Sequence, residues 1–191
     1  MSLTRMEYKI LSEKRALSGD EMLPHWAYRS FGLLGDSIVA FKGPFDVPPG
    51  KWIDLECLKR DTELPVVDML HFVAEHFDTN LREAVLCQYV LVSILEEKLL
   101  HRVPQDGHRL TRLGDDLFDG ENRLSITAVG CTIVSAKIHL GVYLDTEPSK
   151  EIHGLAAYSI DPLELAGVVI NQYRTEMRRL SEKAWRMRPI T

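Results

Sequence analysis

Apolar positions recur at steps of three and four residues in two parts of the chain, and this spacing predicts two amphipathic helices. The first is expected to start after Asn80, because Glu83 three residues later completes a capping-box pattern. Its stripe consists of Leu81, Val85, Gln88, Val92, Leu95 and Leu99. The second starts at Asp161-Pro162, where a hydrogen-bond acceptor precedes a proline at the first helical position. Its stripe consists of Leu163, Ala166, Ile170, Tyr173, Met177, Leu180 and Ala184.

Runs rich in apolar and β-branched residues predict the strands. Residues 37–41 are predicted to form a buried strand, residues 7–11 a short edge strand, and residues 126–144 one long strand. Residues 68–78 are ambiguous, and we favour a strand. As a strand they place His71 and Glu75 on one face and His76 on the other, whereas a helix also places His71 beside Glu75.

A further helix is predicted over residues 22–31, with Asp20 as its cap and Gly32 at its end, although Pro24 fits only at a helix start. Turns or loops are predicted over residues 43–50, 101–108 and 145–154. The pattern of residues 51–58 is ambiguous between strand and coil. The elements do not follow a strand–helix–strand rhythm. They therefore predict an α+β fold with antiparallel connections, in one domain spanning residues 1–191.

Asp119-Gly120 predicts a tight hairpin turn, because this dipeptide accepts the positive φ angles that such turns need. One arm of the hairpin carries Asp115 and Asp116, and the other carries Arg123. Adjacent strand residues point to opposite faces, so only one of the two carboxylates can enter a pocket. Arg123 then either holds a ligand's carboxylate or phosphate, or forms a cross-strand ion pair with Asp116 that contributes little if exposed.

The composition is that of an ordinary globular protein, with 191 residues, 45% apolar and 27% charged. The net charge of −5 argues against a general nucleic-acid binder, which needs a basic face. Basic residues gather near the C-terminus, and we interpret them as a solvated helix end rather than a binding surface. They are Arg174, Arg178, Arg179, Lys183, Arg186 and Arg188.

Cys57, Cys87 and Cys131 are widely separated and form no paired motif, which favours a reducing compartment over disulfides or a zinc knuckle. The N-terminal residues lack the apolar core of a signal peptide. The most apolar window, residues 84–95, is too short to span a membrane. We therefore expect a cytoplasmic protein without a membrane partner.

Lys137 and His139 interrupt an apolar run at a spacing of two, so one side of the predicted strand faces either a ligand or solvent. His71, Glu75 and His76 suggest a metal site, but their order matches no zinc signature and a clear third ligand is lacking. No metal is therefore predicted. The sequence also contains no phosphate loop, dinucleotide fingerprint or nucleophile elbow.

Three segments resemble domain-of-unknown-function family 366: residues 26–47 (WAYRSFGLLGDSIVAFKGPFDV), 68–78 (DMLHFVAEHFD) and 114–118 (GDDLF). The fold of that family is similar to the catalytic domain of class II aminoacyl-tRNA synthetases and to the biotin and lipoate protein ligases. The resemblance implies a central, mainly antiparallel sheet with helices packed on one side.

The hairpin resembles the ligase motif, with Gly114-Asp115-Asp116-Leu117 in place of an Asn-Asp-Leu segment and Arg123 in place of a lysine. His139-Leu140-Gly141 resembles the later His-Gly pattern of lipoate ligases. Residues 43–50 are rich in proline, and the ligases' arginine- and glycine-rich adenylate loop has no counterpart. ATP is the cofactor that the resemblance implies, whereas the missing loop and an arginine that cannot lose a proton argue against adenylation.

We expect a ligase- or acyltransferase-like enzyme of uncharacterised function that binds a small carboxylated or nucleotide-like ligand over the sheet. Asp116 is expected to orient a polar group of the ligand, Arg123 to meet its negative charge, and His139 to act as donor or acid/base. The alternatives are a non-catalytic small-molecule-binding or regulatory module, and a dimerising scaffold. Further ligand-binding candidates are Arg29, Lys42, His71, Asp115 and Lys137.

Overall fold

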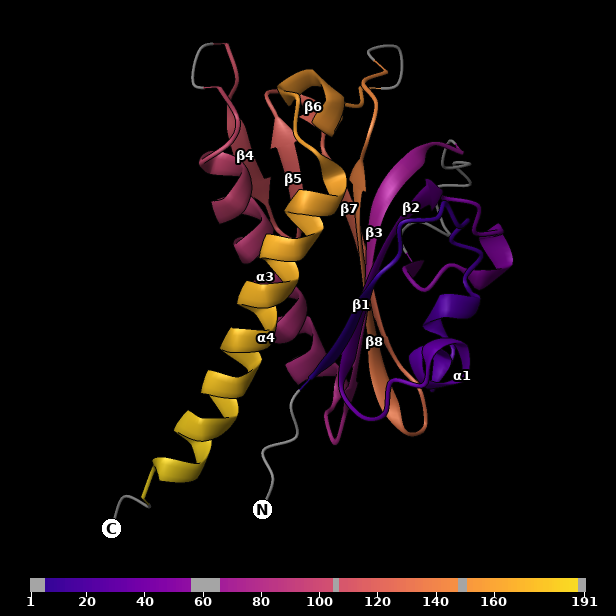
Figure 1. The fold of residues 1–191 in the computed structure, drawn as a ribbon, viewed down its shortest axis with the longest axis vertical. Helices are drawn as coiled ribbons and strands as arrows, with labels where there is room; N and C mark the ends of the chain where they lie inside the picture. The colour runs from indigo at the N-terminus through magenta and orange to yellow at the C-terminus, as the bar shows by residue number, and fades with distance from the viewer. Residues whose placement is uncertain (1–5, 56–65, 105–106, 148–150, 189–191) are drawn as a thin grey trace.

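The computed structural model describes residues 6–55, 66–104, 107–147 and 151–188, and a five-stranded sheet forms its centre (Figure 1). Its strands are β1 (Glu7–Ile10), β2 (Ser37–Pro44), β3 (Asp68–Phe77), β7 (Ser125–Cys131) and β8 (Ser135–Tyr143). They lie in the order β1-β2-β3-β8-β7, with β1 parallel to β2 and all other neighbours antiparallel. The predicted α+β class with a mainly antiparallel sheet is confirmed, as are the short edge strand and the strand over residues 68–78.

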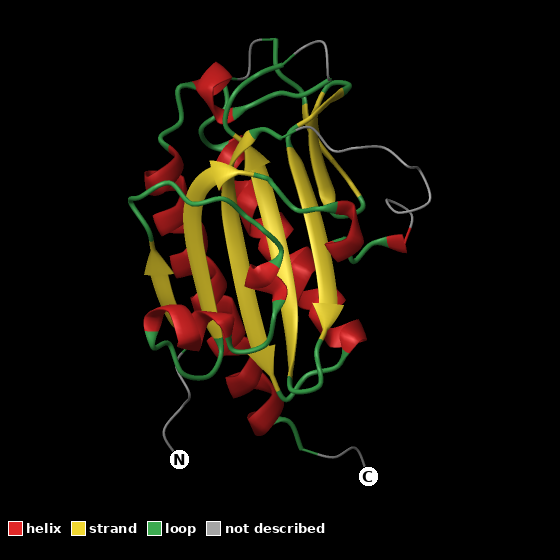
Figure 2. Cartoon of the chain, turned by 90° about the vertical axis from the view of Figure 1, so that its right-hand side faces the viewer, coloured by secondary structure: helices red, strands yellow, loops and turns green. Residues whose placement is uncertain are grey.

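Two long helices cover one face of this sheet, as Figure 2 shows from the opposite side. They are α3 (Leu81–Leu100) and α4 (Pro162–Arg186). Both predicted starts are confirmed, because the side chains of Asn80 and Asp161 accept hydrogen bonds from the backbone N–H groups of Glu83 and Glu164. At Asn80 the Glu83 side chain also accepts from the Asn80 N–H, which completes the capping box.

The even-numbered residues of β3 and β8 face α3 and α4, and we call this side of the sheet the helix face. It is largely apolar, because alternate residues of a strand point the same way and these positions meet the apolar stripes of the helices. The fully buried residues on it include Leu70, Phe72, Ala74, Ile138, Leu140 and Val142.

The odd-numbered residues of β3 and β8 form the opposite side, which we call the loop face. It is crossed by η1 (Asp20–Met22), α1 (Trp26–Phe31), η2 (Pro49–Lys51) and the segments between them (Figure 2). Gly43 in β2 is required here, because a Cβ atom would lie 2.0 Å from the backbone oxygen of Arg15 in the crossing segment. Trp26 and Phe41 belong to a second, smaller core beneath this cover.

A second sheet of three short strands carries the predicted hairpin. Its strands, in order, are β4 (Leu110–Leu113), β5 (Asp116–Asp119) and β6 (Asn122–Arg123). Gly120 has a φ angle of 61° at the turn, as the Asp-Gly signal predicts. A single turn of 3-10 helix, η4 (Leu155–Tyr158), precedes α4.

Two predicted elements differ from the structure. The helix expected over residues 22–31 is divided into η1 and α1, because the chain turns at Pro24 and His25 takes a left-handed φ of 57°. Asp20 does not cap it, and instead its carboxylate accepts a hydrogen bond from Lys51 at 2.6 Å. The single long strand expected over residues 126–144 is the antiparallel pair β7 and β8, which reverses where the Thr132 N–H bonds the Ser135 carbonyl.

The predicted loop over residues 43–50 begins later than expected, because β2 continues to Pro44. The strand β4 was not predicted. Of the ambiguous stretch 51–58, residues 52–54 are coil, while Cys57 and the residues beside it lie outside the described part of the chain.

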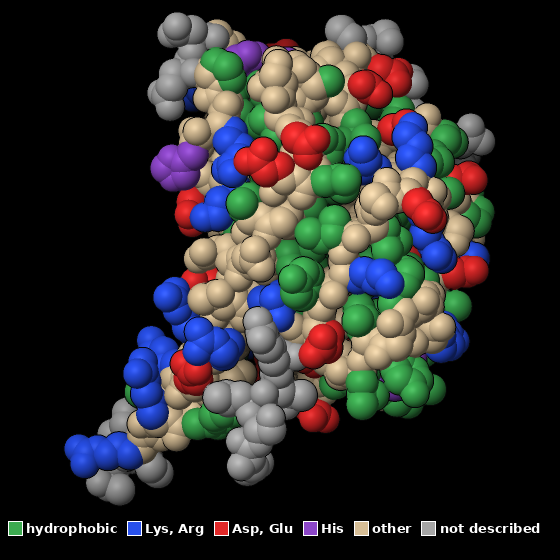
Figure 3. All heavy atoms as spheres, in the orientation of Figure 1, with side chains coloured by type: hydrophobic (Ala, Val, Ile, Leu, Met, Phe, Trp, Pro, Cys, Tyr) green, Lys and Arg blue, Asp and Glu red, His purple; other side chains and the backbone are tan. Residues whose placement is uncertain are grey.

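Basic side chains gather over the C-terminal end of α4 (Figure 3). Acidic residues on the same helix pair with several of them: Arg178 with Glu182 at 2.8 Å, and Arg179 with Glu176 at 2.9 Å. Such exposed pairs at helical spacing each stabilise by only a few tenths of a kcal/mol. Among the described residues, no helix is both long and apolar enough to cross a membrane.

Candidate functional site

A pocket of about 240 Å³ lies on the loop face, between the central sheet and the small sheet. Its floor comes from β7 and β8, and the crossing segments and the hairpin form its walls. Most of the walls are apolar, which suits the hydrocarbon part of a small molecule. The apolar lining includes Leu17, Phe45, Val47, Trp52, Ile53 and Ile126.

The hairpin supplies opposite charges at one side of this pocket, which both Asp116 and Arg123 line. Arg123 Nη2 lies 3.4 Å from Asp116 Oδ2, and the Arg123 side chain is 39% exposed. The other carboxylate oxygen, Asp116 Oδ1, is buried and has no hydrogen-bond partner among the described residues. The hairpin therefore offers a ligand one accessible guanidinium, and beside it lies a carboxylate with one buried, unsatisfied oxygen.

Asp115 has a different role, although it also lines the pocket. Its Oδ2 accepts hydrogen bonds from Gln88 Nε2 at 2.9 Å and Thr127 Oγ1 at 2.6 Å. These bonds connect the start of the hairpin to α3 and β7. Asp115 is thus largely occupied in fixing the hairpin, which leaves Asp116 as the hairpin's carboxylate for a ligand.

Burial raises the pKa of Asp116 to about 6, although the Arg123 guanidinium acts in the opposite direction. The side chain is 19% exposed. Its proton therefore dissociates near physiological pH, and the carboxyl can donate a hydrogen bond below that pKa and accept one above it.

Two adjacent histidines, with ring centroids 5.3 Å apart and ring planes tilted by 37°, form the floor beneath the pocket. His71 Nε2 lies 3.0 Å from the carbonyl oxygen of Gly43, and His71 Nδ1 lies 3.1 Å from His139 Nε2. A carbonyl oxygen can only accept, so in neutral His71 the proton is on Nε2 and Nδ1 accepts from the Nε2–H of His139. The Nδ1 atom of His139 is then an unprotonated acceptor, and His139 itself lines the pocket.

Both histidines are held in the neutral form. Burial lowers the pKa of His71 to about 4, and burial together with the neighbouring His71 lowers the pKa of His139 well below its ordinary value. At neutral pH His139 can therefore accept a proton or a hydrogen bond, but it is not a ready acid.

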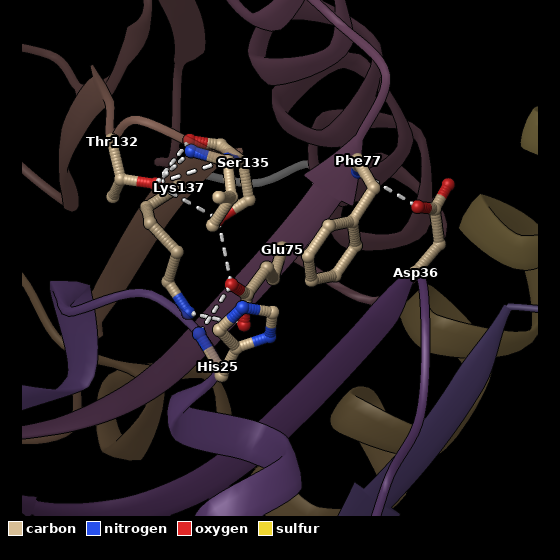
Figure 4. Close-up of polar contacts among 8 residues, drawn as sticks. His25, Asp36, Glu75, Phe77, Thr132, Ser135 and Lys137 are labelled. Carbon is tan, nitrogen blue, oxygen red and sulfur yellow. Dashed lines mark hydrogen bonds and ion pairs between the residues drawn. The ribbon is translucent and has the colours of Figure 1, made fainter.

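A buried ion pair lies further along the same face, beneath α1 (Figure 4). Glu75 Oε2 accepts from Lys137 Nζ at 3.0 Å, and both side chains are at most 2% exposed. Glu75 Oε1 accepts from the Ser135 hydroxyl and the His25 backbone N–H, each at 2.7 Å. Burial lowers the pKa of Lys137, and the Glu75 carboxylate acts against this change. The pair fixes α1 to the sheet and is not open to a ligand.

The structure brings together half of the predicted site residues. Asp115, Asp116, Arg123 and His139 line the pocket, whereas the other four do not. His71 supports His139 from below, and Lys137 is paired with Glu75. Arg29 is exposed on α1, and Lys42 is half-buried on β2.

No pattern in the sequence indicates that residues 17–22 and 45–54 form walls of the pocket. Trp52, for example, donates its indole N–H to the carbonyl of Val47 at 2.9 Å, which closes the proline-rich segment over the pocket. The richness in proline indicated a loop but not the face on which that loop packs.

Comparisons with known proteins agree with this architecture. The family model described as "Domain of unknown function (DUF366)" matches residues 6–188. Uncharacterized protein MJ0805 of Methanocaldococcus jannaschii is 32% identical over 152 residues, covering 77% of this chain and 67% of its own. A protein of unknown function from Pyrococcus horikoshi has a solved structure that is similar with a TM-score of 0.88 and 31% identity, over 97% of this chain and all of that one.

More distant solved structures show the fold alone. A bi-partite lipoate protein ligase from Thermoplasma acidophilum has a TM-score of 0.54 at 13% identity, over 90% of this chain and 84% of that one. A biotin protein ligase mutant from Aquifex aeolicus has a TM-score of 0.59 at 12% identity, over 94% and 73%. The fold is that of the lipoate and biotin protein ligases, which is class II synthetase-like. The family model matches nearly the whole chain, and an uncharacterised relative is 32% identical to it. The chain therefore belongs to the DUF366 family.

Proposed function

We propose that the pocket on the loop face binds a small molecule with an apolar body and a carboxylate or similar anionic end, and that the protein acts on that end as a ligase- or acyltransferase-like enzyme. The observation that carries this proposal is the position of Arg123 and Asp116 at one side of a mostly apolar pocket. A partly exposed guanidinium binds a carboxylate through two parallel hydrogen bonds. The apolar walls remove the rest of such a ligand from water.

The ligands of the structural neighbours are consistent with this choice. The solved structures include protein Ta0514 from T. acidophilum with lipoic acid and the A. aeolicus biotin protein ligase with biotin. Both ligands are small carboxylic acids with an apolar chain. Because the likeness is one of fold, the screen described below tests several such acids.

Three polar residues of the pocket have distinct proposed roles. Arg123 binds the anionic end and stabilises negative charge that develops on it. Asp116 hydrogen-bonds a neighbouring polar group, as donor or acceptor according to its protonation. His139, neutral through burial, accepts a proton or a hydrogen bond at Nδ1.

A non-catalytic binding module is the second candidate, and it is favoured by the segment over residues 43–50. Pro44, Pro48 and Pro49 occur there, and these prolines cannot donate backbone hydrogen bonds to phosphate oxygens as a glycine-rich loop does. On this alternative the protein binds the acid without activating it.

A thermal-shift screen of the full chain with lipoate, octanoate, biotin and ATP tests the proposal. A ligand at about one hundred times its Kd stabilises the folded state by ~2.7 kcal/mol, which raises the Tm of a chain of this size by roughly 5–10 °C. Arg123→Ala is expected to weaken binding of the acid about 10- to 100-fold, because a charge-assisted pair is lost. Arg112→Ala is the matched control, since Arg112 is exposed on the same small sheet and does not line the pocket.

Equal ligand responses in the Arg123→Ala and wild-type proteins would exclude Arg123 as the anion-binding residue. ATP–pyrophosphate exchange in the presence of the acid then separates the two candidates. Acid-dependent exchange indicates an adenylating enzyme, whereas binding without exchange indicates the module.

A further inference from the structure

A cluster of metal-ligating side chains lies outside the pocket, at the other end of the hairpin. His108 precedes β4, Asp119 ends β5, and His153 follows β8 in the connection to α4. One ligand atom from each of the three lies within 4.8 Å of the other two. None of the three residues lines the pocket described above.

We propose that His108, Asp119 and His153 bind one divalent transition-metal ion, with Zn²⁺ as the best match. Two imidazole nitrogens and one carboxylate oxygen are a ligand set that Zn²⁺ prefers, and a fourth position remains for water or a further ligand. His108 Nδ1 and Asp119 Oδ2 are 2.6 Å apart, and His153 Nε2 is 3.8 Å from the same oxygen. Small side-chain rotations bring these atoms to the spacing of tetrahedral ligands around bonds of about 2 Å.

The hydrogen bonds of the cluster leave one ring nitrogen, His153 Nε2, unsatisfied among the described residues. Asp119 accepts from the Arg109 N–H at 2.6 Å, from His108, and from the Tyr158 hydroxyl at 2.9 Å. The His153 Nε2 atom is buried, yet no described residue is hydrogen-bonded to it. A network that existed only to hold Asp119 would not need a second imidazole with a buried, unsatisfied nitrogen facing the same carboxylate.

The orientation of the rings supports the same conclusion. His153 stacks on the Tyr158 ring at 5.1 Å and 16°, and the His108 ring stands nearly perpendicular to His153 at 5.6 Å. The two imidazoles are therefore fixed by aromatic neighbours and direct nitrogen atoms towards Asp119. When an ion binds Nδ1 of neutral His108, the proton that Nδ1 donated to Asp119 moves to Nε2 of the same ring.

The ion would join three segments that are far apart in the sequence. The backbone of Arg123 already bonds this region, since its N–H donates to Glu151 O at 2.7 Å and its carbonyl accepts from the His153 N–H at 3.0 Å. The bound ion thus stabilises the hairpin that carries Arg123 into the pocket. The site does not depend on the proposed function, because it rests only on the three ligands.

The test is metal binding by the full chain after removal of metals with a chelator. Equilibrium dialysis against Zn²⁺, followed by elemental analysis, is expected to give one ion per chain in the wild-type protein. His153→Phe is the decisive variant, because it keeps an aromatic ring on Tyr158 and removes the ligand nitrogen together with the other ring nitrogen. We expect it to fold normally, to lose the bound ion, and to lose the rise in Tm that Zn²⁺ gives the wild type.

Three further variants complete the experiment. His101→Gln removes an exposed histidine outside the cluster and is expected to bind Zn²⁺ as the wild type does. Asp119→Asn, which keeps an oxygen for the Arg109 N–H, is expected to bind at least tenfold more weakly. The measurements are repeated with Cys131→Ser, because Cys131 is an exposed thiol that can bind Zn²⁺.

Failure to bind Zn²⁺ in a one-to-one ratio overturns the proposal. So does unchanged binding in His153→Phe, which would place the ion elsewhere. The visible spectrum of the Co²⁺-substituted protein adds an independent readout: the proposed site gives a tetrahedral spectrum without a thiolate charge-transfer band, and His153→Phe abolishes it.

Discussion

The two faces of the central sheet are built from the same strands but from different kinds of residue. On the helix face β3 and β8 present mainly apolar side chains, which α3 and α4 cover. On the loop face the same two strands present His71, Glu75, Lys137 and His139, all at most 3% exposed. Two long helices bury one face, whereas short helices and irregular segments bury the other (Figure 2).

This difference shows how a fold can separate stability from chemistry. Apolar packing on the helix face supplies most of the hydrophobic stabilisation and tolerates no ligand. Buried polar groups on the loop face are costly unless each has a partner, and most of these are paired with one another. Asp116 differs from them, because it lines the pocket and one of its carboxylate oxygens has no hydrogen-bond partner among the described residues.

Glu75→Gln is the change with the largest expected effect, because it leaves the Lys137 ammonium buried without a counter-charge. Removal of one partner from a buried ion pair costs about 3–5 kcal/mol. We expect a value near the lower limit, since glutamine still accepts hydrogen bonds from His25 and Ser135. Urea denaturation at neutral pH measures the loss.

The pH dependence of this loss provides the control. Burial already lowers the pKa of Lys137 and will lower it further without Glu75, so the penalty should shrink at alkaline pH, where the amine is neutral in both states. The double variant with Lys137→Met should recover most of the stability. If it were no more stable than Glu75→Gln, the cost would come from disturbed packing under α1 rather than from an unpaired charge.

The sequence predicted the apolar helix face of the sheet better than the polar loop face. The helix face follows from alternation in the strands and from two helical stripes with clear caps at Asn80 and Asp161. The division of β7 from β8 was missed because the reversal contains Thr132, Ile133 and Val134, β-branched residues that are typical of strands rather than turns.

The candidate site was predictable where its residues are close in sequence. The Asp-Gly turn predicted that Asp116 and Arg123 lie on facing arms, and the spacing of Lys137 and His139 placed them on one side of a strand. Pairings between distant residues, such as Glu75 with Lys137 or His108 with Asp119 and His153, depend on strand order and loop packing, which no local pattern specifies.

Asp116→Asn is expected to have an intermediate effect. It should change how the free energy of unfolding depends on pH. The pKa of Asp116 is raised from 3.8 to about 6, so the native state keeps this proton at pH values where the unfolded state has lost it. The contribution of Asp116 to stability is therefore fully present below pH 3.8 and is lost as the pH rises through about 6. Asparagine cannot ionise, so the variant should be more stable than the wild type by about 3 kcal/mol above that pKa.

The measurement is the difference in unfolding free energy between Asp116→Asn and wild type across this pH range, which removes the contribution of other titrating groups. A difference that stays constant with pH would show that the Asp116 carboxyl has an ordinary pKa. The same ionisation should weaken binding of a carboxylate ligand as the pH rises through about 6 in the wild type, because Asp116 then repels the anion bound to Arg123.

Tyr173→Phe tests the helix face, where we expect the smallest effect. The hydroxyl of Tyr173, a residue of α4, lies 2.7 Å from His76 Nε2, and both side chains are buried between that helix and the sheet. Loss of one neutral hydrogen bond costs about 1 kcal/mol, and His76 keeps its contact with Asp36 at 3.4 Å. Chemical denaturation measures this cost, and Tyr8→Phe, which removes a phenol from an exposed ring on β1, should be neutral by comparison. Because His76 points away from the loop face, neither variant should alter the ligand response of the pocket; a changed response in Tyr173→Phe would mean that the two faces are coupled through β3.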